Sequence, residues 1–152
     1  MMPVQSRKGF TLLEILIVMA LIAILAGIVI AAINPARQFA NARNSTRYAH
    51  LNTIMNAINA NMVEHNGSFS CVTGALPATA TDMGVAAPGY DIGPCLVTTY
   101  VSSMPFDPSV TGAHWTSTTD YDTGYTIMQG ADGRITVTAP AAENGVSISM
   151  TR

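Results

Sequence analysis

The pattern of hydrophobic and polar residues divides the chain into an apolar run, an amphipathic stretch and a polar C-terminal half. Residues 10–34 read FTLLEILIVMALIAILAGIVIAAIN, and Glu14 is the one charged residue among them. An α-helix of that length extends about 37 Å, which is enough to cross a bilayer with some tilt. A carboxylate inside such a span costs about 2.5–3.5 kcal/mol on insertion scales. The pattern therefore predicts a membrane-spanning helix and a partner that offsets the cost of Glu14.

The periodicity remains helical from residue 35 to residue 66. Gly67 is placed to adopt the left-handed conformation that commonly ends a helix. The sequence therefore predicts one helix over residues 10–66, whose second half supplies one side of a core. The apolar residues of its predicted inner face follow the i, i+3, i+4, i+7 spacing and are Leu51, Ile54, Met55, Ile58 and Met62.

Two residues predict an irregularity in that helix. Pro35 has no backbone N–H, and its ring clashes with the carbonyl of the residue four positions earlier. Gly27 weakens the same stretch by up to about 1 kcal/mol relative to alanine. We expect the helix to kink or to unwind within residues 27–35, and both alternatives stay open.

The C-terminal half changes to Thr, Ser, Gly and Pro, with a period of two that is typical of strands. Residues 68–95 contain three prolines and are expected to form a long irregular loop. The predicted fold class is α+β, with a long N-terminal helix whose second half packs on a small antiparallel β-sheet head. The expected strands are residues 125–129 and 134–138, joined by a hairpin at 130–133, then 146–150, with 96–101 as a weaker candidate.

The net negative charge of the head is unlike that of proteins that bind nucleic acid non-specifically. From Gly67 onward, two arginines face seven carboxylates, so the head carries a net charge of −5. Sequence-independent binding to phosphates needs clustered lysine and arginine. We therefore expect no direct nucleic-acid binding by the head.

The motifs of common enzymes are absent from the sequence. It has no hydrolase elbow, no phosphate loop and no zinc helix motif, and the histidines have no matching acid or nucleophile spacing. We expect no catalytic residues and no enzymatic activity. His50 and His65 are interpreted as surface positions of the stem helix or as contacts between the stem and the head, whereas His114 is assigned no role. Three aromatic residues are interpreted as head core or subunit contacts, namely Trp115, Tyr121 and Tyr125.

Three aspartates form the most suggestive polar cluster, namely Asp107, Asp120 and Asp122. Oxygen-rich loops can hold Ca²⁺ when carboxylates and carbonyls converge. The segment lacks EF-hand spacing, however, and ordinary aspartate turn chemistry explains these residues without a metal. No cofactor is expected, and a weak calcium candidate is left open.

The two cysteines of the chain, Cys71 and Cys95, lie in the head without the spacing of a metal-binding motif. A disulfide between them would close a loop of about 25 residues and stabilise the head by roughly 3.5 kcal/mol on the chain-entropy model. It would also imply an oxidising exterior compartment. Two unpaired buried thiols remain the alternative, because spacing alone does not bring the pair together.

The segment Arg7-Lys8-Gly9-Phe10-Thr11-Leu12-Leu13-Glu14 resembles the processing site of type IV pilins and of the type II secretion pseudopilins. The resemblance consists of a short basic leader, a Gly-Phe junction, a glutamate five residues into the mature chain and an apolar helix, and it covers residues 7 to about 34. It implies that a prepilin peptidase cuts between Gly9 and Phe10 and N-methylates Phe10. The new ammonium would then pair with Glu14 of its own chain, at helical i, i+4 spacing, or with that of a neighbour.

The resemblance also implies a domain organisation and a location. Residues 1–9 would be the leader, 10–34 the transmembrane and filament-core helix, 35–66 the stem helix and 67–152 the extracytoplasmic head. The precursor would cross the cytoplasmic (inner) membrane once, with its N-terminus in the cytoplasm, and the assembled protein would form a cell-surface pilus. Its partners would be copies of itself in a homopolymeric helical filament, the peptidase, an inner-membrane assembly platform and, before assembly, membrane lipid.

Several functions share these features. A major pilin would serve adhesion, motility or DNA uptake, a pseudopilin would serve secretion, and a minor pilin would prime a filament. A membrane-anchored binding module that never polymerises belongs to a different class. A secretory signal peptide is disfavoured by the length of the apolar run. A plain signal anchor would leave Glu14 without a partner.

Overall fold

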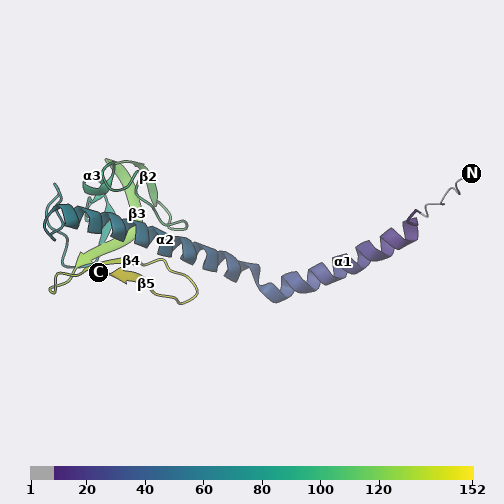
Figure 1. Ribbon diagram of the computed structural model, residues 1–152. Coiled ribbons are helices and arrows are strands. Elements are labelled where there is room, and N and C mark those ends of the chain that lie inside the picture. The colour runs from purple at the N-terminus through teal and green to yellow at the C-terminus, as the bar shows by residue number, and fades with distance from the viewer. Residues whose placement is uncertain (1–8) are drawn as a thin grey trace, which may run out of the picture. The chain divides into compact units, whose positions relative to one another are not determined.

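The computed structural model describes residues 9–152, which divide into two compact units, one ending at Gln38 and the other comprising Phe39–Arg152 (Figure 1). Of the expected leader, only Gly9 lies among the described residues. The first unit contains helix α1, Leu12–Ile33, and the start of helix α2, Pro35–Glu64. The remainder of α2 belongs to the second unit, the head unit, together with the sheet.

The residue between the helices ends α1. Asn34 adopts a left-handed conformation (φ 49°, ψ 81°), and Pro35 is the first residue of α2. The predicted helix over residues 10–66 is therefore interrupted within the expected stretch 27–35, and two helices cover it. Proline disfavours the helical conformation in the residue before it, and asparagine tolerates the left-handed region better than most residues. Gly27, by contrast, continues α1 without interruption.

The sheet has five strands, and every pairing among them is antiparallel. The β3–β4 hairpin is the one that the alternation predicts, and Gly133 takes the positive φ (81°) that its turn requires. Strand β2 pairs with the beginning of β3, beside the path β1-β3-β4-β5. The strands are β1 Thr81–Gly84, β2 His114–Ser117, β3 Asp120–Gln129, β4 Ile135–Ala139 and β5 Ile148–Thr151.

The α+β fold class is confirmed, but two expectations for the head are wrong. Residues 96–101 form no strand, because Leu96 closes the short helix α3, Gly93–Leu96, and a single bridge joins Val97 and Val101. The expected irregular loop at 68–95 contains β1 and most of α3. These short elements depend on pairing and packing with distant parts of the chain, which local periodicity does not reveal.

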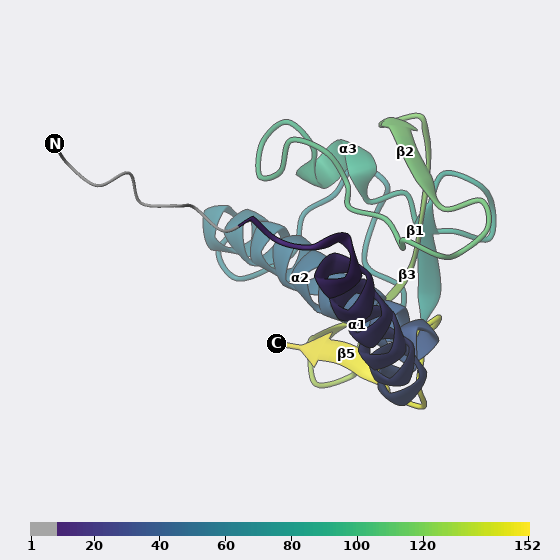
Figure 2. The ribbon, with the colours of Figure 1, turned by 90° about the vertical axis from the view of Figure 1, so that its right-hand side faces the viewer.

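The core of the head unit lies between α2 and the sheet. Four residues of the predicted stripe, Leu51, Ile54, Met55 and Ile58, are at most 1% exposed, and Met62 is partly buried. In both views of the ribbon, α3 and β5 lie on opposite sides of α2 (Figure 2). Residues of the sheet and of α3 pack with the inner face of α2 in one core cluster. The other fully buried side chains of the core include Met83, Ile92, Leu96, Met104, Tyr125, Ile127, Ile135 and Val137.

Candidate functional site

The start of α1 is built by a capping box. Thr11 is the N-cap in an extended conformation, and its Oγ1 accepts a hydrogen bond of 3.2 Å from the backbone N–H of Glu14. The Glu14 Oε2 in turn accepts from the Thr11 backbone N–H at 3.2 Å and from the Thr11 hydroxyl at 3.3 Å. A carboxylate in the first turn also suits the positive end of the helix dipole. The Thr-x-x-Glu pattern is the sequence signature of this motif, so Thr11 could have been expected as a partner of Glu14 from the sequence alone.

The expected cleavage site lies outside the helix. Gly9 and Phe10 precede the N-cap, and Phe10 is 84% exposed. Pairing of Phe10 with Glu14 of the same chain assumed that both belong to one helix, but α1 begins only at Leu12. Phe10 lies outside the helix in the uncleaved chain, and the same-chain pairing of a cleaved Phe10 ammonium with Glu14 stays a prediction. The pairing with a neighbouring chain stays a prediction.

Helix α1 exposes apolar side chains on all sides. None of its 22 residues is buried within the described chain. Its length and composition are sufficient to cross a membrane. An all-round apolar surface requires lipid or other protein around it, because in water this area would be left unburied.

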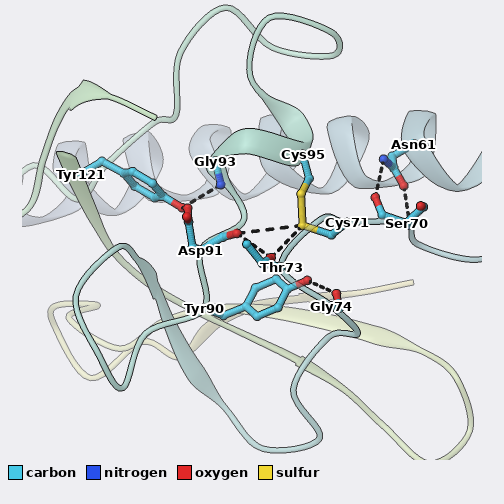
Figure 3. The surroundings of a disulfide bond; sticks show 10 residues. All are labelled: Asn61, Ser70, Cys71, Thr73, Gly74, Tyr90, Asp91, Gly93, Cys95 and Tyr121. Atoms are coloured by element: carbon cyan, nitrogen blue, oxygen red, sulfur yellow. Dashed lines mark hydrogen bonds between the residues drawn. A yellow bond between two sulfur atoms is a disulfide. The ribbon is translucent and has the colours of Figure 1, made fainter. Parts of the chain in front are cut away.

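The two cysteines form a disulfide, with their Cα atoms 5.2 Å apart (Figure 3). The region around it is fastened to α2, because Asn61 exchanges two hydrogen bonds with the backbone of Ser70 (2.9 and 3.0 Å). On the sheet side, the Tyr121 hydroxyl donates to Asp91 and accepts from a backbone N–H. Burial raises the pKa of Tyr121 far above its usual value, so this hydroxyl keeps its proton.

The three aspartates considered for calcium are held by separate partners. Asp107 is fully buried beside Arg47, Asp120 lies 3.1 Å from an exposed histidine, His114, and Asp122 accepts from the backbone N–H of Gly124. Burial alone would raise the pKa of Asp107, but hydrogen bonds from Arg47 and Ser109 outweigh it and lower the pKa. Among residues 9–152, no three acidic, histidine or cysteine side chains are grouped as metal ligands.

Two of the histidines make contacts that belong to the fold. His50 Nδ1 lies 2.9 Å from the Tyr125 hydroxyl, with the two rings edge to face, and burial lowers the pKa of His50. His65 Nδ1 lies 2.7 Å from the carbonyl oxygen of Asn61, four residues earlier. Both fit the expected roles as contacts of the stem helix.

A buried ionic cluster on α2 was not expected from the sequence. Arg47 is completely buried and forms a two-pronged pair with Asp107, with Nε–Oδ2 and Nη2–Oδ1 distances of 2.7 and 3.0 Å. Arg47 stands four residues before Leu51, in line with the apolar stripe, and this position is the signal that a reading of the sequence could have used. We name the group the Arg47 cluster, and its members are Arg43, Asn44, Arg47, Asp107, Ser109 and Glu143.

Comparison with known proteins identifies the N-terminal segment. The prokaryotic N-terminal methylation motif matches residues 5–30. This is the type IV prepilin-like signal, and it supports membership of the pilin and pseudopilin family and a structural rather than an enzymatic protein. The match and α1 together fit a membrane-anchored precursor. Searches of curated proteins and of solved structures found no match.

Proposed function

We propose that the chain is a structural subunit of a type IV pilus-like filament, assembled through its N-terminal helix. The observation that carries this proposal is that the methylation motif, residues 5–30, overlaps over residues 12–30 with helix α1, which buries no side chain in the described chain. Such a helix needs lipid before assembly and other copies of itself afterwards. Repeated head-to-tail contacts without rotational closure produce an open filament.

Processing is the first step of the proposed function. A prepilin peptidase cuts between Gly9 and Phe10 and N-methylates Phe10, while the precursor crosses the inner membrane with its N-terminus in the cytoplasm. The exposure of Phe10 and its position outside α1 support this role, because a peptidase needs access to the bond that it cleaves. An inner-membrane assembly platform then adds the mature subunit to the filament.

Assembly gives Glu14 a second partner. In the precursor, its carboxylate is bonded to Thr11 within the capping box. In a filament, the ammonium of Phe10 from an adjacent copy pairs with this carboxylate in a region that excludes water, where opposite charges attract more strongly. Glu14 thereby sets the position of the incoming subunit, a use of buried ion pairs that is known in other assemblies.

The first experiment determines the N-terminus and the intact mass of the native protein in sheared-surface and membrane fractions. A chain that begins with methylated Phe10 and is abundant in sheared filaments supports a major pilin for adhesion, motility or DNA uptake. The same processed chain confined to membranes supports a pseudopilin, a minor pilin or a membrane-anchored binding module. Cells without the peptidase are the matched control. An intact Met1 in cells with the peptidase would contradict the proposal.

A further inference from the structure

The first turns of α2 that belong to the head unit carry a polar face. This face has no role in the function proposed so far. Its inward side chains, Asn44 and Arg47, are buried, although the next inward turns of the same helix are apolar. The face that α2 presents to the head therefore changes from directional polar contacts to non-directional apolar ones. Directional contacts of the first kind each require a particular position of the head.

Arg47 uses its full capacity for hydrogen bonding. A guanidinium group has five N–H donors, and all five have acceptors here. Nε and one Nη2 proton bind Asp107, and the second Nη2 proton binds the Ser109 hydroxyl at 2.6 Å. The two protons of Nη1 bind the side-chain oxygens of Asn44 and Glu143, at 2.8 and 3.0 Å. Rotating or sliding the head along α2 would break several of these bonds at once.

The cluster joins α2 to two segments that are far away in sequence. Asn44 donates to the backbone carbonyl of Glu143 and accepts from its backbone N–H, at 2.9 and 3.0 Å. Arg43 holds the Glu143 carboxylate with a second two-pronged pair. Asp107 binds the backbone N–H groups of Ser109 and Val110 as well as Arg47. The segment around residue 107 and the segment around residue 143 are thus fixed at one place on the helix.

Stability alone does not account for such a cluster. Replacing a buried ion pair by apolar residues of similar size is often neutral or stabilising, because desolvation offsets the attraction. The hydrophobic contribution of the adjoining apolar turns, in contrast, is non-directional and roughly proportional to the buried area. The distinctive contribution of the Arg47 cluster is therefore geometrical.

We propose that the Arg47 cluster is a registry device that fixes the head at one position along and around α2. The proposal rests on the function proposed above, because each subunit of a filament must satisfy contacts through its helix and contacts through its head together. A head that occupies several positions on α2 satisfies both sets only part of the time. Arg47 is thus a positioning residue for assembly.

The test compares Arg47→Lys with wild type and with Ile58→Val. Lysine keeps the charge beside Asp107 but lacks the planar fork. Ile58→Val weakens the apolar part of the same interface and leaves the cluster intact. Spin labels are attached to noncanonical residues at the exposed positions 45 and 147, so that no cysteine is added and the disulfide is unchanged. Pulsed electron paramagnetic resonance on the full chain then measures the distance between the two labels. We expect a wider or shifted distance distribution for Arg47→Lys only.

Filament assembly gives the second readout. Affinity falls in proportion to the competent fraction of a subunit, so two equally populated positions would raise the critical concentration for assembly about twofold. A single narrow distance in folded Arg47→Lys, equal to that of wild type, would overturn the proposal. If Arg47→Lys does not fold, the apolar double variant Arg47→Met with Asp107→Leu is measured instead. Failure of both to fold also contradicts the proposal. Absence of filaments from wild type refutes the proposed function, whereas the distance measurement still decides the registry.

Discussion

Arg43 and Arg47 of α2 both bind the carboxylate of Glu143, but replacing each of them should lower the stability of the head by very different amounts. Arg47→Met leaves the fully buried Asp107 without its cation, whereas Arg43→Met removes a side chain that is 35% exposed. Removing one partner of a buried ion pair costs about 3–5 kcal/mol, because the remaining charge stays buried and unpaired. Exposed pairs contribute little, so Arg43→Met should cost only a small part of that amount.

The expected loss of unfolding free energy in Arg47→Met corresponds to a melting temperature that is lower by more than about 10 °C for a domain of this size. The assay is urea denaturation of the full chain in detergent micelles. The single tryptophan, Trp115, provides the fluorescence signal, since its ring packs 5.2 Å from Tyr121 in the head. In both variants, the unfolding free energy should fall with urea concentration at the same slope as in wild type. The urea concentrations at the midpoints of unfolding should differ. Equal midpoints for the two variants, or a loss below about 1 kcal/mol for Arg47→Met, would refute the argument from burial.

Three further predictions concern other contacts. Replacing Cys71 and Cys95 together by serine should lower the free energy of unfolding by about 3.5 kcal/mol, measured in urea, because the disulfide closes a loop with a sequence separation of 24. Glu14→Ala should reduce filament yield strongly while cleavage before Phe10 continues, and normal yields of sheared filaments would contradict the proposed pairing. Hydrogen bonds from arginine lower the pKa of Glu143 from 4.5 to about 2, so the stability from this pairing is complete above about pH 4.5 and is lost as the pH falls toward 2. Glu143→Gln should reduce the pH dependence of the melting temperature in that range.

The parts of the fold that the sequence predicted are those encoded by local patterns. The apolar run, the stripe from Leu51 to Ile58 and the β3–β4 hairpin each arise from neighbouring residues. Strands β1 and β2 are only four residues long, and both form by pairing with β3. The sequence of β1, TDMG, has little preference for a strand by itself. Its existence depends on a register with β3, such as Thr81 opposite Ile127, which no local pattern contains.

The candidate sites divide in the same way. Gly9, Phe10 and Glu14 stand in a contiguous motif, so the sequence alone was enough to select them. The Arg47 cluster was missed because Asp107 and Glu143 are 60 and 96 residues away from Arg47 in sequence. A charged residue in an apolar stripe shows that a partner is needed, but it does not identify that partner.

The break at Asn34 has a consequence for the way the chain is solvated in a bilayer. The 22 residues of α1 extend about 33 Å, close to the roughly 30 Å thickness of the hydrocarbon layer. The last four carbonyls of a helix have no partner within it, and hydrocarbon offers them no hydrogen bonds. If α1 crosses a bilayer, its end at Ile33 places these carbonyls near the aqueous interface, where water satisfies them. A break one or two turns earlier, near Gly27, would leave the same groups in the hydrocarbon layer, so the position of Pro35 fits hydrophobic matching in a membrane-anchored precursor.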